Sequence, residues 1–128
     1  MNAPLVSIIM PTYNAEKYIL EAIRPVIAQS FKNWELLIIN DGSTDATEDV
    51  ILKLSDPRIV YMKQENRGVS AARNSALSKM TGDFFCFLDA DDSFPTNSLM
   101  SRIELFQNPN INFVDGKVLR MNSDMTRV

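Results

Sequence analysis

The stretch Phe84-Phe85-Cys86-Phe87-Leu88-Asp89-Ala90-Asp91-Asp92 runs from five apolar residues directly into three carboxylates within four positions. A short, aromatic-rich apolar run that follows Gly82 predicts a fully buried strand rather than a helix. Carboxylates crowded at the end of such a strand raise each other's pKa unless a cation holds them. We therefore predict a divalent-metal site at the carboxyl end of a sheet strand. The alternative is a solvated acidic turn.

Strand-like and helix-like segments alternate along the rest of the chain. Strands are expected at 5–10 (closed by Pro11), 34–39, 58–62, 84–88 and 112–119. Helices are expected at about 15–29 (shortened or kinked by Pro25), from a capping-box-like pair Asp45/Glu48, at 68–80, and from Pro95. This alternation predicts an α/β fold, a Rossmann-like, mostly parallel sheet with helices on both faces.

Composition limits the classes of function. The 128 residues, 45% of them hydrophobic, suit a single domain spanning 1–128. A net charge of -3 argues against nucleic-acid binding, and no apolar run is long enough to span a membrane. The chain has no histidine, which excludes Ser-His-Asp and Cys-His catalysis and most zinc sites. The one cysteine, Cys86, is expected to be a buried hydrophobe in a central strand, and a single thiol fits a cytoplasmic location.

In a parallel sheet the turns after successive strands lie along one edge, where ligands bind. Thr12, Tyr13, Asn14, Asp41 and the acidic residues should therefore converge. The Tyr13 ring could stack on a planar base, although Tyr, Asn and Pro are also ordinary turn residues. Asp41 could accept a hydrogen bond from a ring N–H, or it could cap the following helix.

Two arginines lie at the start of the helix expected at 68–80. A helix N-terminus and guanidinium groups both favour a nearby anion. For Arg67 we prefer a surface role. Two carboxylates two residues apart in an extended segment, Asp89 and Asp91, would face the same side and address one ion. Oxygen-only ligands favour Mg²⁺ or Mn²⁺.

Four motifs occur together in a recognisable order: Pro11-Thr12-Tyr13-Asn14, Asn40-Asp41-Gly42-Ser43-Thr44-Asp45, the segment 66–74, and Asp89-Ala90-Asp91-Asp92. From about residue 6 to 115 the chain resembles the nucleotide-binding half of family 2 inverting glycosyltransferases, which have the glycosyltransferase A fold. The resemblance implies a nucleotide site made by Pro11, Thr12, Tyr13, Asp41, Arg73 and Asp89. It further implies that Asp91 ligates Mn²⁺ or Mg²⁺, with Asp89 on the ribose or on a metal-bound water, and that Asp92 supports the turn.

The resemblance also implies a function. The expected reaction transfers a sugar from a nucleotide-diphosphate sugar, with a UDP-sugar favoured, to a hydroxyl of a glycan or lipid-linked acceptor with inversion, in cell-envelope polysaccharide synthesis. No residue of 116–128 resembles the family's general base, so we expect this base beyond Val128 and a truncated fragment that is inactive alone. The fragment could self-associate, and the missing regions could hold it at the inner face of the membrane. The alternative is a non-catalytic nucleotide-binding or regulatory domain. A phosphoacceptor receiver or a nucleotidyltransferase fits less well, because neither an acid nor a glycine-rich loop follows the first strand.

Overall fold

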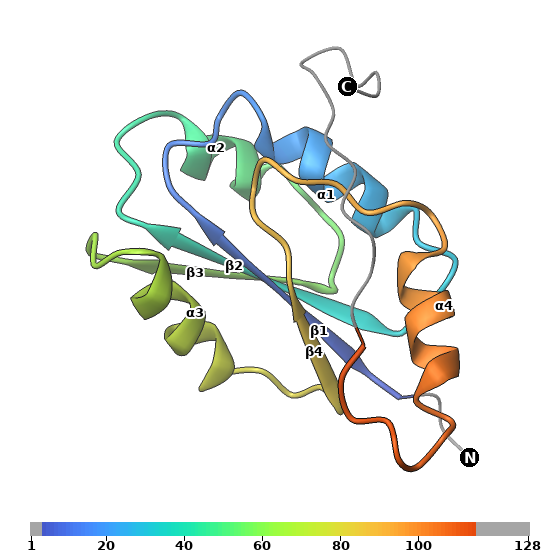
Figure 1. The fold of residues 1–128 in the computed structure, drawn as a ribbon. Coiled ribbons are helices and arrows are strands. Elements are labelled where there is room, and N and C mark those ends of the chain that lie inside the picture. The colour runs from blue at the N-terminus through green and yellow to red at the C-terminus, as the bar shows by residue number, and fades with distance from the viewer. Residues whose placement is uncertain (1–3, 115–128) are drawn as a thin grey trace, which may run out of the picture.

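The computed structural model describes residues 4–114 and contains a four-stranded parallel sheet in the order β3-β2-β1-β4 (Figure 1). The strands are β1 (Val6–Thr12), β2 (Trp34–Asp41), β3 (Ile59–Gln64) and β4 (Phe84–Phe87). The helices are α1 (Ile19–Ile27), α2 (Thr47–Leu52), α3 (Val69–Leu77) and α4 (Ser98–Leu105). The predicted α/β architecture is confirmed.

Helices cover both faces of the sheet. Buried side chains of α1, α2 and α4 pack on one face, where β1 contributes Ile8 and Met10. On the opposite face, Ala72 and Ala76 of α3 pack against Ile9 of β1 and against Leu37 and Ile39 of β2. The small alanine side chains let α3 lie close to the two central strands.

The prediction that Pro11 closes the first strand is wrong. Pro11 and Thr12 continue β1, in register with Ile39 and Asn40 of β2. Hydrogen-bonding direction alternates along a parallel strand, and the carbonyl of Ile9 accepts from Leu88 on the β4 side. Pro11 faces that same side two residues further on, beyond the last residue of β4. Its missing N–H therefore removes no ladder hydrogen bond.

The prediction of a fully buried central strand at Phe84–Leu88 is also wrong. Among the described residues β4 pairs only with β1, so it is an edge strand. Phe84 stacks on Phe106, with ring centroids 4.5 Å apart, on the α4 side. Phe85 and Phe87 point to the α3 side, which α3 leaves uncovered there, and are 50% and 42% exposed. Cys86 is partly buried, and burial raises the pKa of its thiol to about 12.

The helices are shorter than predicted. Helix α1 begins at Ile19 and ends two residues after Pro25. The capping box before α2 is incomplete: the Asp45 carboxylate accepts the Thr47 N–H at 3.0 Å, but Glu48 pairs with Lys63 at 2.8 Å. No strand is present at 112–114, and 115–119 lie outside the described residues. Among residues 4–114 we find no helix that combines the length and the hydropathy of a membrane span.

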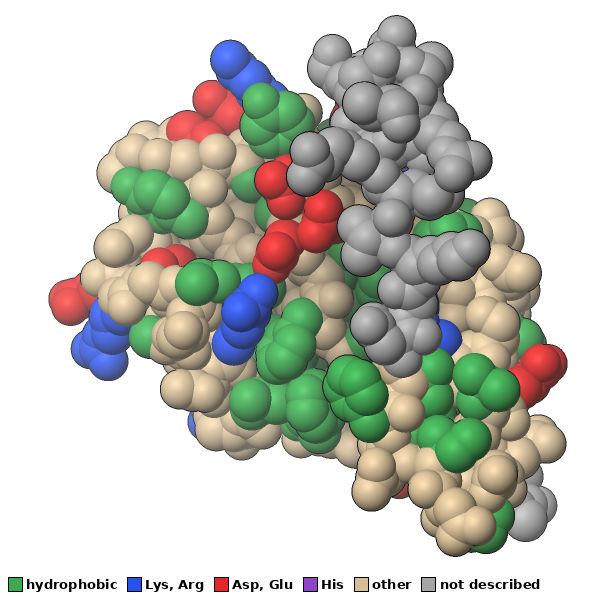
Figure 2. All heavy atoms as spheres, in the orientation of Figure 1, with side chains coloured by type: hydrophobic (Ala, Val, Ile, Leu, Met, Phe, Trp, Pro, Cys, Tyr) green, Lys and Arg blue, Asp and Glu red, His purple; other side chains and the backbone are tan. Residues whose placement is uncertain are grey.

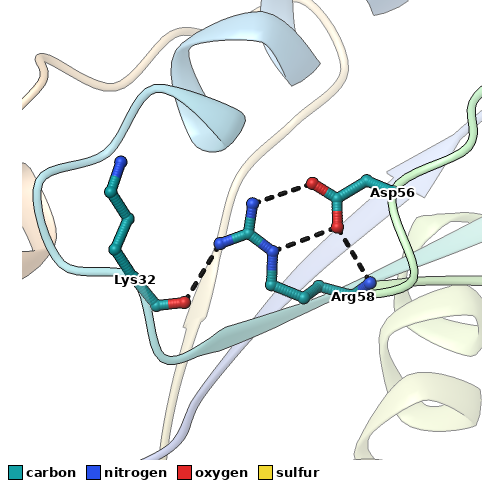
Figure 3. Close-up of polar contacts among 3 residues, drawn as sticks. All are labelled: Lys32, Asp56 and Arg58. Carbon is teal, nitrogen blue, oxygen red and sulfur yellow. Dashed lines mark hydrogen bonds and ion pairs between the residues drawn. The ribbon is translucent and has the colours of Figure 1, made fainter.

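The amino-terminal edge of the sheet is held by polar contacts. Arg58, just before β3, donates to both carboxylate oxygens of Asp56 and to the Lys32 carbonyl (Figure 3). Its guanidinium carbon also lies 3.8 Å from the centre of the buried Trp34 ring. These contacts hold the start of β3 beside the start of β2, at the end of the sheet opposite the carboxyl ends of the strands.

Candidate functional site

The described residues form a cleft of about 430 Å³ at the carboxyl edge of the sheet. A smaller pocket of about 80 Å³ shares three of its lining residues, Pro11, Tyr13 and Val69. Between them the two hollows bring together every residue of the predicted site: Pro11, Thr12, Tyr13, Asp41, Arg73, Asp89 and Asp91. Segments up to 80 positions apart in the chain therefore meet at one edge, because each follows or flanks a strand that points the same way.

The turn after β1 carries two exposed aromatic rings. Tyr13 is 53% exposed and Tyr18, just before α1, is 54% exposed, and both line the cleft. Pro11 and Thr12, the last two residues of β1, are buried. Sequence reasoning did not single out Tyr18; its position five residues after Tyr13, at the start of a helix, is the signal that could have found it.

Asn14 fixes this turn to the loop after β2. Its backbone is left-handed, with φ 48°. Its N–H donates to Ser43 Oγ at 3.0 Å, and its Oδ1 accepts the Thr44 N–H at 2.7 Å. An asparagine suits this position because it tolerates a left-handed backbone and supplies a carbonyl oxygen. Hydrogen bonds thus join the first two predicted motifs, 11–14 and 40–45.

The Asp41 carboxylate holds the loop that leads into α3. It accepts hydrogen bonds from Gln64 Nε2 at 2.8 Å and from the main-chain N–H groups of Arg67 and Gly68, both at 2.9 Å. Burial raises the pKa of this carboxyl, but the three donors outweigh it and hold the pKa below its ordinary value. The structural alternative for Asp41, capping the helix that follows β2, is not what the contacts show: Asp41 binds the start of α3 instead.

Gly42 allows these two loops to approach. Its φ is +72°, and a Cβ placed there would lie 2.7 Å from the Asn66 main-chain nitrogen. Asn66 in turn donates to the Asp41 carbonyl at 3.1 Å. A residue larger than glycine would push the loop at 66–68 away from Asp41.

The acidic residues lie in a turn rather than in an extended segment. The N–H of Asp92 donates to the Asp89 carbonyl at 3.0 Å, which closes the turn. The alternation argument for Asp89 and Asp91 is therefore wrong, yet the turn brings the same groups together. One carboxylate oxygen each from Asp89, Asp91 and Asp92 lie within 4.8 Å of one another. Burial, with the negative charges of Asp91 and Asp89, raises the pKa of Asp92.

This acid turn, defined here as residues 89–92, fits a hard divalent cation. It offers three carboxylates and no softer ligand, which is the donor set that Mg²⁺ or Mn²⁺ prefers. Burial is the main cause of the raised pKa of Asp92, and the negative charges of Asp91 and Asp89 add to it; a cation bound at the acid turn would offset that charge repulsion.

Arg73 joins the acid turn to α3. Its Nη2 lies 3.3 Å from Asp89 Oδ1, and its guanidinium carbon is 5.0 Å from the centre of the Phe87 ring. On the face drawn in Figure 2, acidic side chains gather beside a basic one and border a hydrophobic patch. Arg67, in contrast, is exposed and contributes its main-chain N–H to Asp41.

Comparison with known sequences identifies relatives of this chain. The family description "Glycosyl transferase family 2" matches residues 7–127. An Escherichia coli protein named UDP-Glc:alpha-D-GlcNAc-diphosphoundecaprenol beta-1,3-glucosyltransferase WfgD is 42% identical over 125 residues, which cover 97% of this chain and 49% of that protein. A Bacillus subtilis protein named putative teichuronic acid biosynthesis glycosyltransferase TuaG is 42% identical over 105 residues, 79% of this chain and 41% of that one. The chain thus spans half or less of these relatives.

Solved structures share the fold. S. aureus TarS in complex with UDP-GlcNAc matches with a TM-score of 0.76 and 31% identity, over 80% of this chain and 31% of that one. The Pyrobaculum calidifontis mannosyltransferase PcManGT, in complex with GDP-Man and Mn²⁺, matches with a TM-score of 0.71 and 27% identity, over 78% and 31% of the two chains. Together with the matched region and the parallel sheet, these likenesses show that the chain belongs to glycosyltransferase family 2 and has the glycosyltransferase A fold.

Proposed function

We propose that this chain binds the donor nucleotide and the metal in an enzyme that transfers a sugar from a UDP-sugar to an acceptor hydroxyl with inversion. The observation that carries the proposal is the meeting of an aromatic turn, a buried carboxylate, an arginine and an acid turn around the cleft and the smaller pocket beside it. An aromatic ring can stack on a base, and a carboxylate can accept a hydrogen bond from the base's ring N–H. An arginine and a metal held by carboxylates can both bind a diphosphate.

The base is proposed to lie in the part of the cleft next to Tyr13. Its exposed ring offers a flat apolar surface for stacking, with Tyr18 on the same cleft. Asp41 lines the adjoining smaller pocket. Its Oδ2 accepts one hydrogen bond in the structure, from Gly68, so a further lone pair remains for a ring N–H. Pro11 and Thr12 form the floor of this part of the site.

The diphosphate is proposed to lie toward Arg73 and the acid turn. Asp91 is the more exposed of the two predicted ligands and would hold Mg²⁺ or Mn²⁺. Asp89 would contact the ribose or the ion. A bound divalent ion would offset the negative charge of the departing nucleoside diphosphate. Arg73 lines the same cleft and supplies a positive charge there.

The donor proposal draws on the relatives as well. The E. coli relative is named for UDP-Glc, and TarS is described with UDP and with UDP-GlcNAc, whereas PcManGT is described with GDP-Man. We therefore propose uridine as the base and a glycan or lipid-linked acceptor at the cytoplasmic face of the membrane. The group that takes the proton from the acceptor hydroxyl is proposed to lie beyond Val128, and inversion follows from the family resemblance.

Calorimetric titration of UDP into the 128-residue chain with Mn²⁺ tests the proposal. We expect micromolar-to-millimolar affinity that is lost when the metal is chelated, and weaker binding of GDP. The Asp91→Asn variant should lose the metal dependence, whereas Asp49→Asn, an isosteric change at an exposed position on α2, should behave as wild type. Absence of UDP binding to folded protein with Mn²⁺ present would contradict the proposal.

A further inference from the structure

Arg73 is incompletely bonded in this structure. A guanidinium carries five N–H donors, and here Nη2 makes an ion pair of 3.3 Å with Asp89 Oδ1. The buried Nε of Arg73 has no acceptor among the described residues. The Phe87 ring, 5.0 Å away, supports the guanidinium from one side but accepts no conventional hydrogen bond. Arg73 therefore keeps unused capacity for an anion.

Asp89 belongs to two groups at once. It is the ion-pair partner of Arg73, and it is one of the three carboxylates of the acid turn. A divalent cation on the acid turn would be repelled by the guanidinium, because both are positive and share a partner. A diphosphate in the cleft would attract Arg73, which already lines that cleft.

We propose that Arg73 is the resident counter-ion of the acid turn, and that it makes tight metal binding depend on the nucleotide. Without nucleotide, Arg73 neutralises part of the acid turn and weakens the site for a divalent cation. When a diphosphate arrives, Arg73 turns from Asp89 to the phosphate oxygens and leaves Asp89 to the metal. The inference rests on the proposed function, since it assigns the diphosphate and the metal to the same cleft.

The alternative is that Arg73 is a permanent structural ion pair, whose contact with Asp89 persists whatever is bound. The two ideas differ in what Arg73 does to metal affinity. A displaceable counter-ion lowers the affinity for metal alone and raises the coupling between metal and nucleotide, and such coupling is reciprocal by thermodynamic necessity. A permanent pair leaves the coupling unchanged when it is removed.

The experiment measures Mn²⁺ affinity by electron paramagnetic resonance of the free ion, with and without UDP, in wild type and in Arg73→Met. Without UDP, the variant should bind Mn²⁺ about three- to tenfold more tightly than wild type. The factor by which UDP improves Mn²⁺ affinity should fall by a similar amount. The Arg67→Met variant removes an equal charge two residues before α3 and should change both quantities less than twofold. Arg73→Lys, which keeps the charge, should bind Mn²⁺ alone as wild type does.

Unchanged or weaker Mn²⁺ binding by Arg73→Met, or an equal gain in Arg67→Met, would overturn the inference. So would a failure of Mn²⁺ to bind to both wild type and Arg73→Met. Failure of UDP to bind wild type would instead contradict the proposed function, while the comparison with Mn²⁺ alone would still show whether Arg73 opposes metal binding at the acid turn. If Arg73→Met does not fold, the Nε–H resonance of Arg73 in wild type gives the answer: it should shift on addition of UDP with Mg²⁺, and a signal that does not move would refute the proposal.

Discussion

Replacing Asp41 by asparagine should destabilise the whole fold by about 2–3 kcal/mol. The carboxylate accepts from Gln64 Nε2 and the Arg67 N–H through Oδ1, and from the Gly68 N–H through Oδ2. Asparagine has one acceptor oxygen, so its NH₂ group must face at least one of these N–H donors. The change therefore removes at least one charge-assisted hydrogen bond, leaves a buried donor unpaired, and weakens the remaining bonds by removing the charge.

Urea unfolding followed by the fluorescence of Trp34, the one tryptophan and 2% exposed, measures the effect. The Asp49→Asn control should stay within about 0.5 kcal/mol of wild type. The hydrogen bonds hold the pKa of Asp41 below its ordinary value of 3.8, so the carboxylate stabilises the fold above that pH and loses this contribution as the pH falls through the folded-state pKa. The difference between wild type and Asp41→Asn should thus shrink below about pH 4. A loss under 0.5 kcal/mol at pH 7, or a difference independent of pH, would refute the assignment of Asp41 as the residue that holds the loop before α3.

Three further predictions concern individual residues. Gly82→Ala should destabilise the fold by about 1–3 kcal/mol in urea unfolding, since a Cβ there would lie 2.8 Å from the Leu5 carbonyl oxygen; a stability equal to wild type would show that β4 can move away from β1 freely. Glu35 accepts hydrogen bonds from Ser7 Oγ and from the N–H and hydroxyl of Thr81, which outweigh burial and lower its pKa. Glu35→Gln should lower the free energy of unfolding by about 1–2 kcal/mol at pH 7 and by progressively less below about pH 4.5. A loss that stays constant down to pH 3 would contradict this prediction. Tyr13→Ala should raise the Kd for UDP about 5- to 100-fold in calorimetry without lowering Mn²⁺ affinity, whereas unchanged UDP affinity would remove the ring from the site.

The central part of the fold is predictable from the sequence because its signals are local. The runs at 5–10 and 34–39 are short, rich in Val, Leu and Ile and bounded by turn residues, and they form the two buried central strands β1 and β2. The same runs place Tyr13 and Asp41 at one edge of the sheet, and both line the hollows there. The parallel direction of the two strands is enough to predict that Tyr13 and Asp41 lie close together.

The other features depend on partners that are distant in sequence. The exposure of Phe85 and Phe87 follows from which helices cover the α3 face, and apolar patterning cannot distinguish a buried strand from an aromatic edge strand. The acid turn owes its geometry to one main-chain hydrogen bond between Asp89 and Asp92. The three donors to Asp41 come from residues 23 to 27 positions away, so a local sequence pattern cannot predict these hydrogen bonds.

The exposed Phe85 and Phe87 lie at the unpaired edge of the described sheet. We therefore predict that the 128-residue chain self-associates through this edge. Sedimentation of the wild-type chain across a range of concentrations measures it. A chain that stays monomeric at the highest concentration reached would contradict it.

We infer that one nucleotide–metal site lies at the carboxyl edge of the sheet. Chemical-shift mapping of backbone amides during titration with UDP and Mg²⁺ tests it most directly. The predicted result is that shifts gather at Tyr13–Asn14, at 41–43, at 67–73 and at the acid turn, and leave the opposite edge at 56–58 and 81–83 unchanged. Shifts concentrated at 56–58 and 81–83, or no shifts at millimolar UDP with Mg²⁺, would contradict the claim.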